Sequence, residues 1–317
     1  MRPPLRTMIG MRVGERPSRG IRWIGLVVVA AALLVTACAG PADDRVRIGL
    51  LPWAEVTATA QLWSFLLEAE GVATELVRID TTSPGGIVRT GEVNVVDGMY
   101  ASLSDGDIDV WTGAWLPESH GPQLAEHDDI EILGTWYEDA RLTWAVPVGS
   151  EFTSIGDLEG RAAELGGEIV GVEPGSGHVR VSRADVLPAY DLEDEYTLST
   201  GSSSSMLAAL DRAVALDQPI VVTLWEPHPA YGRYELRNLD DPRGALGAPE
   251  RIDVLATPGF GERHPDVARW LEAFELDEDA LSSLQLRLEA SADGDERQAV
   301  ADWVAEHREE VDGWLGR

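Results

Sequence analysis

Cysteine and lysine are almost or entirely missing from this chain. Its 317 residues contain one cysteine, no lysine and only six histidines. Because Cys38 has no partner cysteine, an internal disulfide is excluded and the folded part must depend on its hydrophobic core. The histidines lack the spacing of zinc ligands, and no Gly-x-Ser-x-Gly sequence places a nucleophilic serine. We therefore expect no metal, no cofactor and no catalytic residue.

Long apolar runs are also scarce, and the one that stands out lies near the start. Residues 24–35 are apolar and follow a segment with six arginines, but they fall short of the roughly 20 residues of a membrane-spanning helix. A Val-Thr-Ala-Cys sequence then ends at Cys38, as in a bacterial lipobox. The pattern predicts a lipoprotein signal peptide over residues 1–37, a lipidated Cys38 and a tether over residues 38–45. The alternative is an ordinary signal peptide with an incidental cysteine.

This segment also predicts a location. A protein processed at Cys38 is held by its lipid at the outer face of the cell membrane, without crossing it. We therefore expect an extracytoplasmic protein whose only contact with lipid is this anchor.

Positive charge is outnumbered throughout. The chain carries 25 basic and 55 acidic residues, a net charge of −30. Without the six leading arginines and Glu15, 19 basic residues remain against 54 acidic ones, a net charge of −35. Such a surface repels nucleic acid and anionic lipid, so neither is expected as a partner. Salt screens the self-repulsion, and the excess of acid indicates adaptation to salty surroundings. The alternative is general solubility in an arginine-favouring genome.

Alternating strand and helix patterns fill the rest of the chain and predict an α/β fold. About 280 residues are enough for a large core divided between two lobes. We expect the chain to cross between lobes near Gly149 and to return along residues 219–224. Strands are expected at residues 46–51, 73–79, 93–96, 107–111, 141–148, 168–172 and 219–224, and helices at 56–70, 154–165, 178–187, 206–216, 264–274, 277–290 and 294–314.

Three tryptophans stand where a strand-like run gives way to a loop. Trp53, Trp115 and Trp225 each lie beside a proline, in a kind of loop where α/β proteins place ligand contacts. Several indole faces suit a methylated cation, because the ring quadrupole attracts it without a hydrogen-bond donor. The alternative is core packing, which fits the tryptophans inside regular patterns: Trp63, Trp144, Trp270, Trp303 and Trp314.

Polar groups near these tryptophans suggest an anion contact. His120 follows Trp115 by five residues, in the same loop, and we expect it to bind an anionic group at the far end of the ligand. A glycine-rich turn ending at Gly177 opens a predicted helix, whose free N–H groups favour an anion. Its alternative is a plain tight turn. For His228 we expect a structural hydrogen bond.

Five stretches of the chain together resemble the substrate-binding proteins of glycine betaine ABC importers. The resemblance runs from about residue 46 to residue 315. It implies an α/β, two-lobed periplasmic-binding-protein fold of type II, with a ligand cleft between the lobes and two crossover strands. Lobe I would comprise residues 46–145 plus 225–317, and lobe II residues 146–224. The matching stretches are Leu51–Glu55, Ala114–His120, Gly134–Glu138, Gly171–Gly177 and Pro219–His228.

The resemblance also implies a site. In the family, three tryptophans form a prism around a trimethylammonium group, and these positions correspond to Trp53, Trp115 and Trp225. A histidine and two backbone N–H groups hold the carboxylate, which corresponds to His120 and to the amides of Gly177 and His178. The chain departs from the family by having a histidine at position 178, where relatives carry an aliphatic residue, and by Pro-His-Pro at residues 227–229 in place of Pro-His-Trp.

The implied function is that of a binding protein. It captures glycine betaine or a related quaternary ammonium osmoprotectant outside the cytoplasm and passes it to a membrane permease and its ATPase. Two alternatives stay open at this point. A choline receptor would share the cation cage but leave His120 and the glycine turn without a carboxylate. A lipoprotein hydrolase would need a nucleophile beside a base, and the sequence contains none.

Overall fold

The structure is a computed structural model that describes residues 44–79, 94–292 and 294–317. The signal peptide and Cys38 predicted from the sequence lie outside these residues. Residues Arg45–Arg317 form one compact unit. Among the described residues, none of the helices is both long and apolar enough to span a bilayer.

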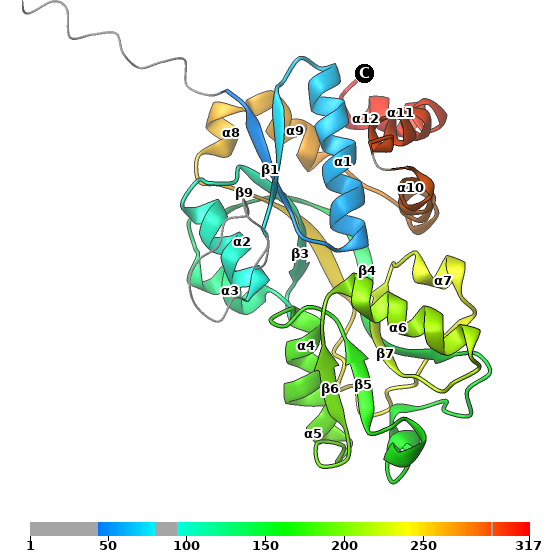
Figure 1. The fold of residues 1–317 in the computed structure, drawn as a ribbon. Helices are drawn as coiled ribbons and strands as arrows, with labels where there is room; N and C mark the ends of the chain where they lie inside the picture. Colours follow the sequence, from blue (N-terminus) through cyan, green and yellow to red (C-terminus); the bar gives the residue numbers. More distant parts are fainter. Residues whose placement is uncertain (1–43, 80–93, 293) are drawn as a thin grey trace, which may run out of the picture. The chain divides into compact units, whose positions relative to one another are not determined.

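A mixed sheet runs through this unit (Figure 1). Its described strands follow the order β2-β1-β3-β9-β4-β7-β5-β6, with β8 paired to β4. β1 is parallel to β2 and β3, and β5 is parallel to β6 and β7, whereas β9 and β4 pair antiparallel with their neighbours. The bounds are β1 (Val46–Leu50), β2 (Thr74–Arg78), β3 (Val110–Leu116), β4 (Glu131–Pro147), β5 (Glu168–Gly171), β6 (Thr197–Thr200), β7 (Val222–Glu226), β8 (Leu236–Asn238) and β9 (Glu250–Ala256).

The long strand β4 joins two portions of this sheet. Its residues 131–140 pair with β9, whereas residues 141–147 pair with β7 and β8. We call β2, β1, β3, β9 and the first part of β4 the β1 side, and the second part of β4 with β7, β5, β6 and β8 the β7 side. The chain passes to the β7 side along β4 and returns through residues 239–249 into β9.

Helices pack on both portions. α1 contacts β1, β3, α10 and α11, and α9 contacts β4. A π-helical turn at Ser182–Val186 joins α4 to α5, and two 3-10 turns lie at Ile155–Leu158 and Ala162–Glu164. The α-helices are α1 (Ala54–Ala69), α2 (Val95–Ser104), α3 (Gly121–Glu126), α4 (Gly177–Val181), α5 (Leu187–Ala189), α6 (Ser203–Ala215), α7 (Ala230–Arg233), α8 (Phe260–Arg263), α9 (Pro265–Glu272), α10 (Glu278–Ala290), α11 (Glu296–Glu306) and α12 (Arg308–Trp314).

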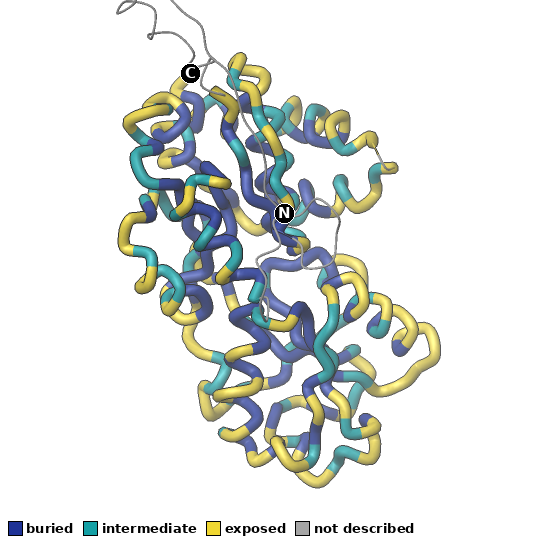
Figure 2. Tube along the Cα trace, turned by 60° about the vertical axis from the view of Figure 1, so that its left-hand side comes forward, coloured by how far each residue is buried: buried dark blue, intermediate teal, exposed yellow. Residues whose placement is uncertain are grey.

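The core follows the central strands. Every residue of β3 and all but one of β9 are buried, and the dark tube of Figure 2 traces them through the molecule. Trp63, Trp144 and Trp303 are almost fully buried and Trp314 nearly so, as the core interpretation predicts. Trp270 is half-buried against the same core.

Several predicted elements differ from the structure. The strand predicted at residues 93–96 is wrong, because Val95 and Val96 begin helix α2, where the Asn94 side chain accepts hydrogen bonds from two backbone N–H groups. The helix predicted at 154–165 consists of two short 3-10 turns. The strand predicted at 141–148 begins ten residues earlier, and β6, β8 and β9 were not predicted. Strand β9 is buried between two neighbours, so it lacks a simple alternating pattern.

Candidate functional site

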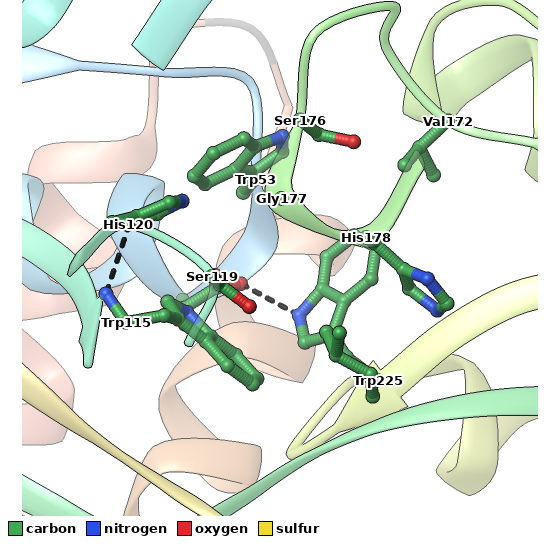
Figure 3. Close-up of a pocket in the computed structure, with 11 residues that line it drawn as sticks. Trp53, Trp115, Ser119, His120, Val172, Ser176, Gly177, His178 and Trp225 are labelled. Atoms are coloured by element: carbon green, nitrogen blue, oxygen red, sulfur yellow. Dashed lines mark hydrogen bonds between the residues drawn. The ribbon is translucent and has the colours of Figure 1, made fainter. Parts of the chain in front are cut away.

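A small cavity lies where the two sides of the sheet meet, and the three predicted tryptophans line it (Figure 3). Trp53 precedes α1, Trp115 lies near the end of β3, and Trp225 near the end of β7. Each keeps only 4–5% of its surface exposed. The cavity is small and lined mainly by aromatic side chains, so it suits a compact ligand. His120, Gly177 and His178 also line it, so the structure brings all six predicted residues together.

The indole N–H groups are held by two buried carboxylates. Trp225 donates from Nε1 to Glu55 Oε2 at 3.0 Å, and Trp53 donates to Glu173 Oε2 at 3.3 Å. Glu173 also accepts from the backbone N–H of Ser203 at 2.7 Å and from its hydroxyl at 2.8 Å. Both pairs connect the β1 side to the β7 side. In one pair the β7 side supplies the tryptophan and the β1 side the carboxylate, and in the other pair these contributions are exchanged. Because these hydrogen bonds use the N–H edges of Trp53 and Trp225, the faces of the two indole rings are left to line the cavity.

Glu55 is the carboxylate closest to the cage. Its side chain lines the cavity and is 1% exposed. Burial raises the pKa of Glu55 to about 7, because the charged form loses its water. Hydrogen bonds from its own backbone, Trp225 and Trp115 favour the charged form, whereas the nearby Glu173 disfavours it. Glu55 is therefore a titratable group in an otherwise largely apolar wall.

His120 supplies a neutral hydrogen-bond donor. Its Nδ1 accepts the backbone N–H of Trp115 at 3.0 Å, so the proton of the neutral ring is on Nε2. Burial, helped by the positive charge of Arg180, lowers the pKa of His120 to about 3. Nε2 forms no hydrogen bond with the described residues. The ring stacks on Trp53 with centroids 5.7 Å apart and planes 19° apart.

A third buried carboxylate positions the loop that carries His120. Glu250, the first residue of β9, accepts backbone N–H groups from Glu118 and Ser119, both at 2.8 Å. It also accepts the hydroxyl of Ser119 at 2.5 Å. Because Ser119 lines the cavity beside His120, these three bonds fix one wall of the site. Behind the same loop, Trp111 packs against His120 with centroids 5.4 Å apart.

The glycine turn approaches this loop closely. Ser176 caps α4, and its hydroxyl accepts the N–H of Val179 at 3.2 Å. The backbone N–H groups of Gly177 and His178 find no acceptor among the described residues. A Cβ on Gly177 would lie 2.6 Å from the Cβ of Ser119, so only glycine permits this approach. The turn thus brings two free donors beside His120.

The side chain of His178 is structural, although its ring also lines the cavity. Nε2 lies 2.9 Å from the Thr143 carbonyl and 2.7 Å from the Leu224 carbonyl, so it carries the proton. Nδ1 then accepts the Ser182 hydroxyl at 3.1 Å, and Trp144 donates to the same hydroxyl oxygen. Burial lowers the pKa of His178 and keeps it neutral. The ring therefore fastens the start of α4 to β4 and β7.

His228 has the structural role expected from the sequence. Its Nδ1 accepts the backbone N–H of Ala230 at 3.0 Å, and its ring meets Trp225 edge-on with centroids 4.5 Å apart. Burial lowers its pKa to about 3. It does not line the cavity.

Sequence reasoning missed the three buried carboxylates. Glu55 follows Trp53 by two residues and Glu173 opens the glycine turn, which is the only signal either offers. In a chain with 55 acidic residues, that signal does not separate a buried carboxylate from a surface one. Burial and the indole partner emerge only from the fold.

Taken together, the cavity offers aromatic faces, one carboxylate and neutral N–H donors. Such a set binds a small charged molecule but contains no activated nucleophile. Across residues 44–79, 94–292 and 294–317, no three His, Cys, Asp or Glu side chains gather to hold a metal ion.

Similarities to characterised proteins agree with this geometry. The chain matches the family described as "Substrate binding domain of ABC-type glycine betaine transport system" over residues 44–306. It is 29% identical over 147 residues to the "Glycine betaine/carnitine transport binding protein GbuC" of Listeria monocytogenes serotype 1/2a (strain 10403S). That match covers 46% of this chain and 48% of the relative, so it spans about half of the relative's length.

Solved structures match over more of the chain. The glycine/betaine/L-proline-binding protein (ProX) of Borrelia burgdorferi gives a TM-score of 0.75 at 27% identity, covering 85% of this chain and 96% of that one. An ABC-transporter choline-binding protein in an unliganded semi-closed conformation gives 0.71 at 25% identity, covering 86% and 92%. These matches confirm the expected type II periplasmic-binding-protein fold. With the family match over residues 44–306, they show that the chain belongs to the substrate-binding domains of ABC-type glycine betaine transport systems, which are binding proteins and not enzymes.

Proposed function

We propose that this protein captures glycine betaine, or a related carboxylated quaternary ammonium compound, outside the cytoplasm for an ABC importer. The observation that carries the proposal is the meeting of Trp53, Trp115 and Trp225 around one small cavity. Each indole face attracts a methylated cation by about 0.5–2 kcal/mol, and more where water is excluded. Three such faces favour a trimethylammonium group over a metal ion, which would need several ligand atoms, and over an ammonium ion, which would need several hydrogen-bond acceptors.

The same cavity also offers hydrogen-bond donors that suit the ligand's carboxylate. His120 Nε2–H and the free N–H groups of Gly177 and His178 are neutral donors in a buried setting, where charge-assisted bonds are strong. We propose that these three donors bind the carboxylate. From the cage and the donors together we expect micromolar affinity, which corresponds to a binding free energy of about −8 kcal/mol.

The donors and the cage come from both sides of the sheet, which supports ligand-driven closure. We propose that the β1 side and the β7 side are the two lobes of the fold. The strand pairing favours borders at Ala140/Arg141 and within residues 239–249, in place of 145/146 and 224/225. A ligand that contacts both lobes stabilises the closed form, and the closed form then docks on the permease.

The lipid anchor is a further part of the proposal. We propose that the chain is processed before Cys38, lipidated there and held at the outer face of the cell membrane. Metabolic labelling with a radioactive fatty acid tests this. The wild-type chain is expected to take up label, and a Cys38→Ala variant is expected to remain unlabelled. Equal labelling of both chains contradicts the anchor.

Choline is the second candidate ligand, because the chain is similar to a choline-binding protein at 25% identity. Choline carries the same cation but no carboxylate, so the donors at His120 and Gly177 would lack a partner. If choline bound more tightly than glycine betaine, the tryptophan cage would still be assigned correctly. The assignment of these donors to a ligand carboxylate would then be wrong.

A fluorescence titration of the full chain tests the cage. Glycine betaine is expected to shift the tryptophan emission of the wild type with micromolar affinity, and Trp115→Ala is expected to bind at least tenfold more weakly. Trp270→Ala is the matched control, because Trp270 is half-buried away from the cavity. Full affinity in Trp115→Ala would contradict the proposed function.

A further inference from the structure

Glu55 is placed where a bound cation would feel its charge. It is the one carboxylate among the described residues that line the cavity, and it holds the Trp225 indole at 3.0 Å. Its position on the first turn of α1 and its 1% exposure keep water away from it. A charge in such a place interacts far more strongly with a neighbouring charge than it would in water.

The other titratable groups around the cavity do not compensate Glu55. His120 and His178 line the cavity and are neutral, because burial lowers the pKa of each. His228 lies behind Trp225 and is neutral for the same reason. Glu173, at the far edge of Trp53, adds only negative charge and opposes the ionisation of Glu55. Arg180, whose positive charge helps to lower the pKa of His120, does not line the cavity. A ligand cation is therefore the positive partner that the wall of this cavity lacks.

We propose that Glu55 determines the specificity of the cavity for cations, and that binding of a cation expels the proton of Glu55 to solvent. This inference rests on the proposed function, since it needs a cation in the cage. The exchange balances: a protonated carboxyl and a ligand cation become a carboxylate–cation pair and one released proton.

The pH dependence follows from linkage. Without ligand, burial raises the pKa of Glu55 to about 7, so near neutral pH a large share of the molecules carries the proton. Bound cation favours the charged form, and by reciprocity the charged form favours the cation. Affinity for glycine betaine is therefore expected to fall about tenfold between pH 8 and pH 6.

A neutral isostere of the ligand gives the opposite expectation. 3,3-Dimethylbutanoate has the shape and the carboxylate of glycine betaine, but carbon replaces the charged nitrogen. Its tert-butyl group gains nothing from the Glu55 carboxylate, and its own carboxylate is repelled by it. The affinity of the protein for this isostere is therefore expected to rise from pH 8 to pH 6. The carboxylate of each ligand remains ionised over this range.

The experiment is calorimetric titration of the full chain in detergent with both ligands, at pH 6, 7 and 8. Each titration uses buffers of different ionisation enthalpy, so that released protons are counted. Near pH 7, wild type is expected to release a fraction of a proton on binding glycine betaine and to take up a fraction of a proton on binding the isostere. Glu55→Gln is expected to bind glycine betaine more weakly at pH 8, with no proton release and a flat profile. Glu68→Gln, on the exposed face of the same helix, is the matched control and is expected to behave as wild type.

The outcomes separate this inference from the proposed function. Glycine betaine binding near pH 7 without proton release, or with the same pH profile in Glu55→Gln, overturns the role of Glu55 alone. Absence of binding at pH 8 overturns both. If Glu55→Gln does not fold, the opposite pH trends of the two ligands in wild type still decide the question.

Discussion

The Trp225 indole and the Glu55 carboxylate are joined by a 3.0 Å hydrogen bond between residues 170 positions apart. Trp53 and Glu173 form the reciprocal pair, 120 positions apart. Each pair links the β1 side to the β7 side through a residue of the cage. The tryptophans therefore have two roles: their faces form the cavity wall, and their N–H edges hold the two sides together.

Removing the indole N–H of Trp225 tests the second role. Trp225→Phe keeps an aromatic face but deprives Glu55 of a donor, and a hydrogen bond to a charged group contributes about 1.5–3 kcal/mol. We expect glycine betaine affinity to fall at least tenfold and the pKa of Glu55 to rise further. Titration calorimetry measures the affinity, with Trp270→Phe as the control outside the cavity. Unchanged affinity would show that the N–H edge is dispensable.

Glu55 also makes the stability of the ligand-free protein depend on pH. Its pKa rises from 4.5 to about 7 on folding, so the folded state holds this proton more tightly. The stabilisation from that proton is fully present below pH 4.5 and is lost as pH rises through 7. The difference in unfolding free energy, Glu55→Gln minus wild type, should therefore grow by about 3 kcal/mol between pH 4.5 and pH 8.

Urea denaturation at a series of pH values measures this difference. Because both proteins share every other titrating group, the difference isolates Glu55. A constant difference over the range would contradict a raised pKa in the folded state.

The sequence could predict the cage but not what holds it. Trp53, Trp115 and Trp225 were identifiable because each stands at a strand exit beside a proline, and the strand ends meet in the fold. Glu55 and Glu250 were not, because their partners lie 170 and about 130 positions away in the sequence.

Strand register explains the remaining misses. β4 continues through two sheet portions, and nothing local marks the change of partner at Ala140. β9 is a strand because it pairs with β3 on one side and β4 on the other. Such tertiary pairing overrides the local sequence pattern of the segment. The lobe borders depend on the same non-local pairing, so the borders that we propose differ from those expected from the sequence.

Gly177 tests the close approach of the glycine turn to the His120 loop. In Gly177→Ala the new methyl group would lie 2.6 Å from the Ser119 side chain and 2.9 Å from its carbonyl oxygen. We expect the two segments to separate, with about 1–3 kcal/mol lost from stability and a tenfold or larger loss of affinity. Gly149→Ala, which meets open space, is the control and should change stability by less than about 0.5 kcal/mol. Wild-type affinity in Gly177→Ala would contradict the role of the turn.

His120 distinguishes a carboxylated ligand from choline. In His120→Asn the side-chain oxygen can still accept the Trp115 N–H, whereas the Nε2 donor is lost. We expect glycine betaine to bind about tenfold more weakly and choline to be unaffected. Competition titration measures both, and His264→Asn, remote from the cavity, is the control. Equal losses for the two ligands would mean that His120 supports the cage and does not bind the carboxylate.

The most direct measurement is calorimetric titration of the full chain with glycine betaine, proline betaine, carnitine, dimethylsulfoniopropionate, choline and ectoine, at low and high salt. We predict micromolar binding of a carboxylated methyl-onium compound and much weaker binding of choline. Because ring faces bind the cation, that affinity should change little with salt. Binding of choline as tightly as glycine betaine would remove His120 and the glycine turn from the ligand site. Binding of none of these compounds would contradict the account.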